Sequence, residues 1–139
     1  MITDPIFETI YNEKILKKLK KRFGKFEKIH VDFRVSDVGM SNFMAILTKK
    51  GRRGEVIMVV PNENGEIWLH TKSFYPDGTY RLMSGGLEMD ENPHKALKRE
   101  VREETGFKTK IDRCLAVITY TLTSEQQQLP FVSYVFRTP

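Results

Sequence analysis

The sequence predicts an α+β domain built on a mixed β-sheet. Its 139 residues are enough for one domain with a single hydrophobic core. The composition, 40% hydrophobic and 29% charged, is typical of a globular protein and argues against a disordered or fibrous chain. Segments with strand and helix periodicity follow one another in an irregular order, which favours hairpins over a doubly wound parallel sheet. Because no repeat or linker divides the chain, we expect a single domain over residues 1–139.

The first predicted element is a helix over residues 5–22. Asp4 can cap it, Pro5 suits its first position, and Gly24 can end it. Strands are expected next. Their ranges are 29–35, with the alternation of a half-buried strand, then 43–48, 55–60 and 66–72, and finally two near 109–121 and 131–137.

The positive charge is concentrated near the N-terminus, in a basic helical extension over residues 1–28. The formal net charge is +5, and residues 1–30 contribute eight Lys and Arg against four Asp and Glu. The run Lys17–Arg22 holds most of this excess. We interpret it as a solvated helix face; the alternative is a patch that attracts phosphates.

The cysteine content and the lack of long apolar segments indicate the compartment. Cys114 is the only cysteine, so no intrachain disulfide can form. The longest aliphatic run, residues 56–60, is far shorter than the roughly 20 residues of a membrane span. We therefore expect a cytoplasmic protein that has no membrane partner.

A second helix, predicted over residues 92–105, carries three closely spaced carboxylates. Glu100, Glu103 and Glu104 follow one another at i, i+3 and i+4, so they share one face of the helix. Their mutual repulsion favours a hard divalent cation with oxygen ligands, Mg²⁺ or Mn²⁺. The alternative is a charged solvent-facing helix in which Arg99 and Glu103 form an i,i+4 pair.

The segment that includes this helix resembles the signature of the Nudix hydrolase family, G-x5-E-x7-R-E-U-x-E-E-x-G-U, where U is a bulky apolar residue. All seven fixed identities occur at the correct spacing within residues 85–107, the Nudix box. The matching positions are Gly85, Glu91, Arg99, Glu100, Val101, Glu103, Glu104, Gly106 and Phe107. This is a specific motif, although it spans only 23 of the 139 residues.

The resemblance implies roles for the residues of the box. Glu100, Glu103 and Glu104 match metal-binding carboxylates, and Ser84 stands where the family often has a glycine whose carbonyl binds metal. The structural positions are Gly85 and Gly106 together with the pair Glu91 and Arg99, which would tie the loop to the helix. The role of Glu88 is left open: it is either a carboxylate linked to the metal or a loop residue with no part in the site.

The activity implied by the resemblance is Mg²⁺-dependent hydrolysis of a diphosphate linkage in a nucleoside diphosphate joined to another moiety. A metal-activated water would attack phosphorus, with Glu100 or Glu103 as general base. Glu125 is a further candidate base, because some branches of the family place the base in a later loop. The alternative function is a non-catalytic Nudix-fold module that binds a nucleotide or RNA.

Residues outside the box are expected to select the substrate. Arg81, Lys72 and Tyr80 flank the loop that enters the box and could contact phosphate or base; each could also be an ordinary surface or core-edge residue. His70 and Trp68 are interpreted as partly buried packing residues. The expected partner is a small nucleotide-type diphosphate, with nucleic acid not favoured and the oligomeric state, a homodimer included, left open.

The resemblance also implies an α/β/α sandwich with an added N-terminal helix. Many members of the family continue into a C-terminal helix that covers the sheet, and no such segment follows Pro139. The sequence leaves open whether the N-terminal helix or a partner chain supplies this cover, or whether the chain has been trimmed.

Overall fold

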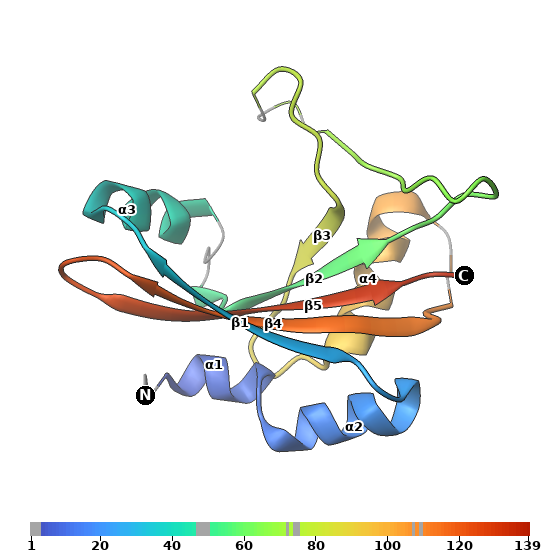
Figure 1. The fold of residues 1–139 in the computed structure, drawn as a ribbon, viewed down its shortest axis with the longest axis horizontal. Helices are drawn as coiled ribbons and strands as arrows, with labels where there is room; N and C mark the ends of the chain where they lie inside the picture. Colours follow the sequence, from blue (N-terminus) through green and yellow to red (C-terminus); the bar gives the residue numbers. More distant parts are fainter. Residues whose placement is uncertain (1–3, 47–50, 72, 74–75, 107, 109) are drawn as a thin grey trace.

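The computed structural model describes residues 4–46, 51–71, 73, 76–106, 108 and 110–139. Its core is a five-stranded mixed sheet with helices on both faces (Figure 1). The helices are α1 (Pro5–Ile10), α2 (Glu13–Phe23), α3 (Asp37–Ile46) and α4 (Pro93–Thr105). The strands are β1 (Glu27–Arg34), β2 (Gly54–Val59), β3 (Met83–Gly86), β4 (Arg113–Thr123) and β5 (Gln128–Arg137).

The strand order is β1-β4-β5-β2-β3, which confirms the α+β class with a mixed sheet. Strands β4 and β5 form an antiparallel hairpin at the centre. On either side, β1 pairs with β4 and β2 pairs with β5, both in parallel. Strand β3 is antiparallel to β2 and forms one edge of the sheet, so the start of the Nudix box lies at this edge.

Two hydrophobic clusters lie on opposite faces of the sheet. The larger one joins α1, α2 and α4 to the sheet, with Leu19, Leu97 and Tyr134 among its buried members. The smaller one packs α3 against the other face near the β4–β5 turn, around Met40 and Phe131. The chain therefore has the expected three layers, and the N-terminal helices cover the face that also carries α4. No helix among the described residues is long and apolar enough to cross a membrane.

The predicted helix over residues 5–22 is two helices. Asp4 caps α1 as expected, accepting a hydrogen bond from the Phe7 N–H at 2.9 Å. The chain then turns at Asn12, whose side chain accepts from the Ile15 N–H at 3.0 Å and starts α2. Gly24, with φ of 79°, ends α2 as predicted. Asn12 is a second N-cap, and the uninterrupted helical periodicity concealed it.

Two predicted strands are wrong. The segment predicted as strand 43–48 lies in α3 as far as Ile46, and the remainder lies outside the described residues. The segment 66–72 has no regular strand among its described residues; it makes only isolated bridges, Pro61 with Ile67 and His70 with Arg81. Strand β1 is present but mostly exposed, because its position at the sheet edge leaves its apolar side chains open on one side.

Candidate active site

Helix α4 holds the carboxylates of the box in place through local signals. The Asn92 side chain accepts hydrogen bonds from the N–H groups of His94 and Lys95 at 2.9 and 3.3 Å, capping the first turn. Gly106, in the left-handed region with φ of 76°, ends the helix. Leu97 is buried against the sheet with its neighbours in the larger cluster, which fixes the rotation of the helix about its axis.

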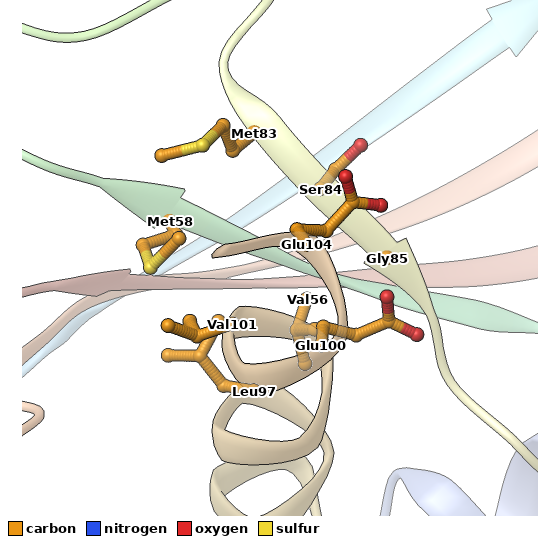
Figure 2. Close-up of a pocket in the computed structure, with 9 residues that line it drawn as sticks. All are labelled: Val56, Met58, Met83, Ser84, Gly85, Leu97, Glu100, Val101 and Glu104. Atoms are coloured by element: carbon orange, nitrogen blue, oxygen red, sulfur yellow. The ribbon is translucent and has the colours of Figure 1, made fainter. Parts of the chain in front are cut away.

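Glu100 lies directly against the backbone of β3. A Cβ atom added at Gly85 would be 2.3 Å from Cγ and Cδ of Glu100, so any larger residue there would have to displace the Glu100 side chain. Figure 2 shows the carboxylates of Glu100 and Glu104 both pointing towards β3, near Gly85 and Ser84. Two of the three predicted carboxylates and the predicted carbonyl donor therefore border the same small pocket between α4 and the edge strand.

Arg99 organises the remaining acidic groups. Its Nε donates to Glu91 Oε2 at 3.0 Å and its Nη2 to Glu91 Oε1 at 3.1 Å, a bidentate pair between loop and helix. Its Nη1 also donates to Glu100 Oε1 at 2.9 Å and lies 3.3 Å from Glu103 Oε2. The hydrogen bond to Glu91 is the main cause that raises the pKa of Arg99, so the guanidinium stays charged.

The three carboxylates differ in their surroundings. The Glu100 side chain is 17% exposed, and burial raises its pKa above the ordinary value; the charges of Glu103 and Glu104 act in the same direction while Arg99 opposes them. The Glu103 side chain is 59% exposed and pairs with Arg99. No group of three His, Cys, Asp or Glu among the described residues is already arranged to hold a metal ion.

The donor chemistry nevertheless fits a hard cation. Two carboxylates and a nearby backbone carbonyl are oxygen donors, and Mg²⁺ characteristically takes one or two carboxylates while keeping waters and substrate oxygens. A preformed cage of three carboxylates is therefore not required. The pocket residues that would hold the ion are Glu100, Glu104 and Ser84.

Arg52 is a residue of this region that the sequence did not single out. Its Nη2 donates to Glu88 Oε1 at 2.7 Å, and a Cβ at Gly86 would be 2.3 Å from its Nη1. Gly85 and Gly86 thus admit two different side chains, one on each face of β3. The consecutive glycines of the box were the available signal, but nothing in the sequence links Arg52 to them.

Of the predicted substrate residues, Arg81 lies close to a further carboxylate. Its charge lowers the pKa of Glu55, as does a hydrogen bond with Ser133, although burial is the larger cause and raises that pKa overall. Tyr80 is 63% exposed, and Lys72 lies outside the described residues. Trp68 is 60% exposed, so the prediction that it packs in a partly buried position is wrong.

Glu125 is not brought to the box. It lies in the β4–β5 turn, where the Ser124 N–H donates to the Gln127 carbonyl. Gly85 on β3 pairs with Val56 on β2, and Val56 pairs in turn with Tyr134 on β5, so Tyr134 marks the position of Gly85 along β5. That is six residues beyond the start of β5 at Gln128, or about 20 Å along the strand.

The comparisons with known proteins agree with this geometry. A family model for the NUDIX domain matches residues 51–139. A MutT-like protein of Streptomyces ambofaciens is 36% identical over 63 residues, which cover 45% of this chain and 40% of that protein. Mouse diphosphoinositol polyphosphate phosphohydrolase 3-alpha is 38% identical over 71 residues, covering 51% of this chain and 40% of that protein.

The chain belongs to the NUDIX family, as the family match shows. The contact of Glu100 with Gly85 and the hydrogen bonds of Arg99 agree with this assignment. Nudix hydrolases generally use a divalent metal ion. The matched segments span about 40% of the length of these curated relatives. The match begins at residue 51, so α1, α2, β1 and α3 lie outside it although they pack on the same sheet.

Proposed function

We propose that this chain is a divalent-metal-dependent hydrolase that cleaves a diphosphate linkage, with Mg²⁺ as the ion and Mn²⁺ as a substitute. The observation that carries the proposal is the Glu100 carboxylate, which occupies the space that a side chain at position 85 would otherwise fill. Such a close fit places a partly buried acid beside a backbone edge.

In this proposal, some residues bind the metal ion and others hold the metal-binding carboxylates in position. Glu100 and Glu104 with the Ser84 carbonyl would hold the ion, which when bound neutralises phosphoryl charge and acidifies a water molecule. Arg99 keeps Glu91, Glu100 and Glu103 in fixed positions through its hydrogen bonds. A bidentate guanidinium–carboxylate pair is well suited to this because its geometry is rigid.

Glu100 is the best candidate for the general base. Its side chain is 17% exposed and borders the pocket at β3, whereas the side chain of Glu103 is 59% exposed and does not line that pocket. Glu125 would need to act from a turn about 20 Å away along the strand. We therefore favour Glu100 over Glu103, and both over Glu125.

The substrate class that we propose is a nucleoside diphosphate linked to another moiety. Arg81, beside Glu55, supplies a cation next to a half-buried acid on the sheet face that faces away from α4. The name of the mouse relative denotes a phosphohydrolase of diphosphoinositol polyphosphate. The compounds tested should therefore include phosphoanhydrides that are not nucleotides.

The test is a cleavage assay in which chromatography resolves the phosphorylated products, over nucleoside diphosphate conjugates, dinucleoside polyphosphates and a diphosphoinositol polyphosphate, with and without Mg²⁺. We expect metal-dependent turnover of at least one compound, abolished in Glu100→Gln. The matched control is Glu125→Gln, which removes the same charge far from the box and should leave turnover unchanged. Metal-dependent nucleotide binding with no turnover of any compound would favour the binding-module alternative.

A further inference from the structure

A basic groove lies between α2 and the first turn of α4, at the opposite end of α4 from Glu104. The groove encloses about 450 Å³, and its polar lining consists of Lys18, Lys21, Arg22, Asn92, His94 and Lys95. Ten residues separate His94 from Glu104, a rise of about 15 Å along the helix. The groove is therefore a separate feature from the pocket at β3.

Its cations come together because of the helical repeat. Lys18, Lys21 and Arg22 stand at i, i+3 and i+4, within about 100° of arc on α2. None of these three, nor Lys95, forms an ion pair with an acidic side chain of the described residues. Lys17 and Lys20, on the same helix, do not line the groove. The lining therefore carries four positive charges without an internal counter-charge.

The first turn of α4 adds to this imbalance. It contains no acidic residue, although a helix N-terminus favours negative charge. Lys95 places a further positive charge there instead. An anion in the groove would be attracted by both the helix dipole and the four side chains.

His94 provides an independent sign of a ligand. This residue lines the groove and is only 9% exposed, and its ring makes no hydrogen bond with a described residue. One side of the ring is covered by Phe23, with ring centroids 5.4 Å apart. Burial, followed by the charges of Arg22, Lys98 and Lys95, lowers the pKa of His94 to about 4, so the ring is neutral at pH 7 and retains an N–H donor.

We propose that the groove between α2 and α4 is an anion-binding site for a compact ligand with several adjacent phosphate groups. The four cations would contact its oxygens, and the His94 ring would donate a hydrogen bond from the floor. Four cations gathered on two turns of α2 and the first turn of α4 suit a compact ligand better than an extended strand. The groove lining offers no exposed Phe, Tyr or Trp ring for base stacking, which disfavours single-stranded RNA.

The test measures binding of inorganic tripolyphosphate by calorimetry in metal-free buffer, where the carboxylates at β3 repel anions. We expect saturable binding that Lys18→Gln/Lys21→Gln weakens by about tenfold. The matched control is Lys17→Gln/Lys20→Gln, which removes the same two charges from the same exposed helix outside the groove. Equal weakening in both variants, or no binding by the wild-type chain, would overturn the proposal.

Further measurements distinguish the source of the phosphates and the position of the ligand. A nucleoside triphosphate should bind no more tightly than tripolyphosphate if phosphates alone are recognised. Ligand binding should also raise the His94 pKa, followed by NMR of the ring proton, because an anion stabilises the charged imidazole. An unchanged His94 pKa at saturation, or tighter binding of an RNA oligonucleotide that depends equally on Lys17 and Lys20, would contradict a compact phosphate site.

Discussion

The two ends of α4 differ in charge: the first turn has Lys95 and no acidic residue, whereas the last turn has Glu103 and Glu104 beside Arg102. At the first turn, Lys95 joins the cations of α2 with no acidic residue nearby in the helix. In the second half, Glu100, Glu103 and Glu104 approach the C-terminus, where the dipole favours cations. A helix shaped only by stability would have the reverse arrangement. The difference is consistent with the two proposals above, an anion at one end and a cation at the other.

The two ends differ in how much of this imbalance the chain itself relieves. At the carboxylate end, Arg99 supplies hydrogen bonds to Glu100 and Glu103, while Glu104 receives none from it. At the basic end, the described residues supply no equivalent. We therefore expect the carboxylate end to be organised before its cation binds, and the basic end to depend more strongly on its ligand.

The largest expected effect is at the carboxylate end. Glu104→Gln should reduce kcat/KM by at least about a hundredfold, a loss of roughly 2.7 kcal/mol in transition-state stabilisation. The matched variant is Glu103→Gln, which should lose less because Glu103 is paired with Arg99. Steady-state kinetics on a substrate found in the cleavage assay would check both. Equal losses in the two variants would remove the distinction drawn between them.

At the basic end, lowering the pH should destabilise the fold through His94. Its pKa is lowered from 6.5 to about 4, so the unfolded chain binds a proton that the folded chain does not. Stability is therefore fully present above pH 6.5 and is lost progressively towards pH 4. Between pH 7 and pH 5 the loss is about 2 kcal/mol. Urea unfolding at both pH values measures it, and His94→Gln should reduce the difference.

The glycine at β3 allows a smaller test of the carboxylate end. Gly85→Ala places a methyl group against Glu100 and must displace its flexible end, so we expect about a tenfold loss of activity, or 1.4 kcal/mol, with the fold retained. The neighbouring Gly86→Ala is the control, because its methyl group meets Arg52 instead. A larger loss in Gly86→Ala would show that Arg52 and Glu88 matter more than Glu100.

The smallest expected effect concerns the dipole. Lys95→Glu gives the first turn of α4 the charge that a helix N-terminus favours and should stabilise the fold by about 0.3–1 kcal/mol. The gain should shrink in high salt, since Lys95 is exposed and its interactions are screened. The same variant should bind tripolyphosphate more weakly. A gain in stability together with unchanged tripolyphosphate binding would separate the dipole from the proposed site.

Local signals predicted α4 well because the sequence contains each one explicitly. Asn92, Pro93 and Gly106 mark its ends, and they occupy the expected positions in the structure. The same kind of signal is present at α3, where the Ser36 hydroxyl accepts a hydrogen bond from the Gly39 N–H and starts the helix. The apolar run that follows has no periodicity by which to distinguish a buried strand from a buried helix.

The site could be predicted only where the motif fixed it. Glu100 and Gly85 are motif positions, and the structure brings them into contact. Arg52 contacts Glu88 across 36 residues of sequence, a proximity that depends on how β2 and β3 pair. The groove likewise depends on α2 packing beside α4, which no spacing within either helix reveals.

The contact between the Tyr134 hydroxyl and the Ile10 carbonyl has a consequence for synthesis of the chain. Its two partners are 124 residues apart, and the central strand β5, which carries Tyr134, is made after every other element. The first helices therefore leave the ribosome long before the surface that they cover exists. Their apolar side chains stay exposed to solvent, or bound to a chaperone, until β5 has been synthesised. Folding of the nascent chain is accordingly expected to be late and cooperative, without a stable N-terminal intermediate.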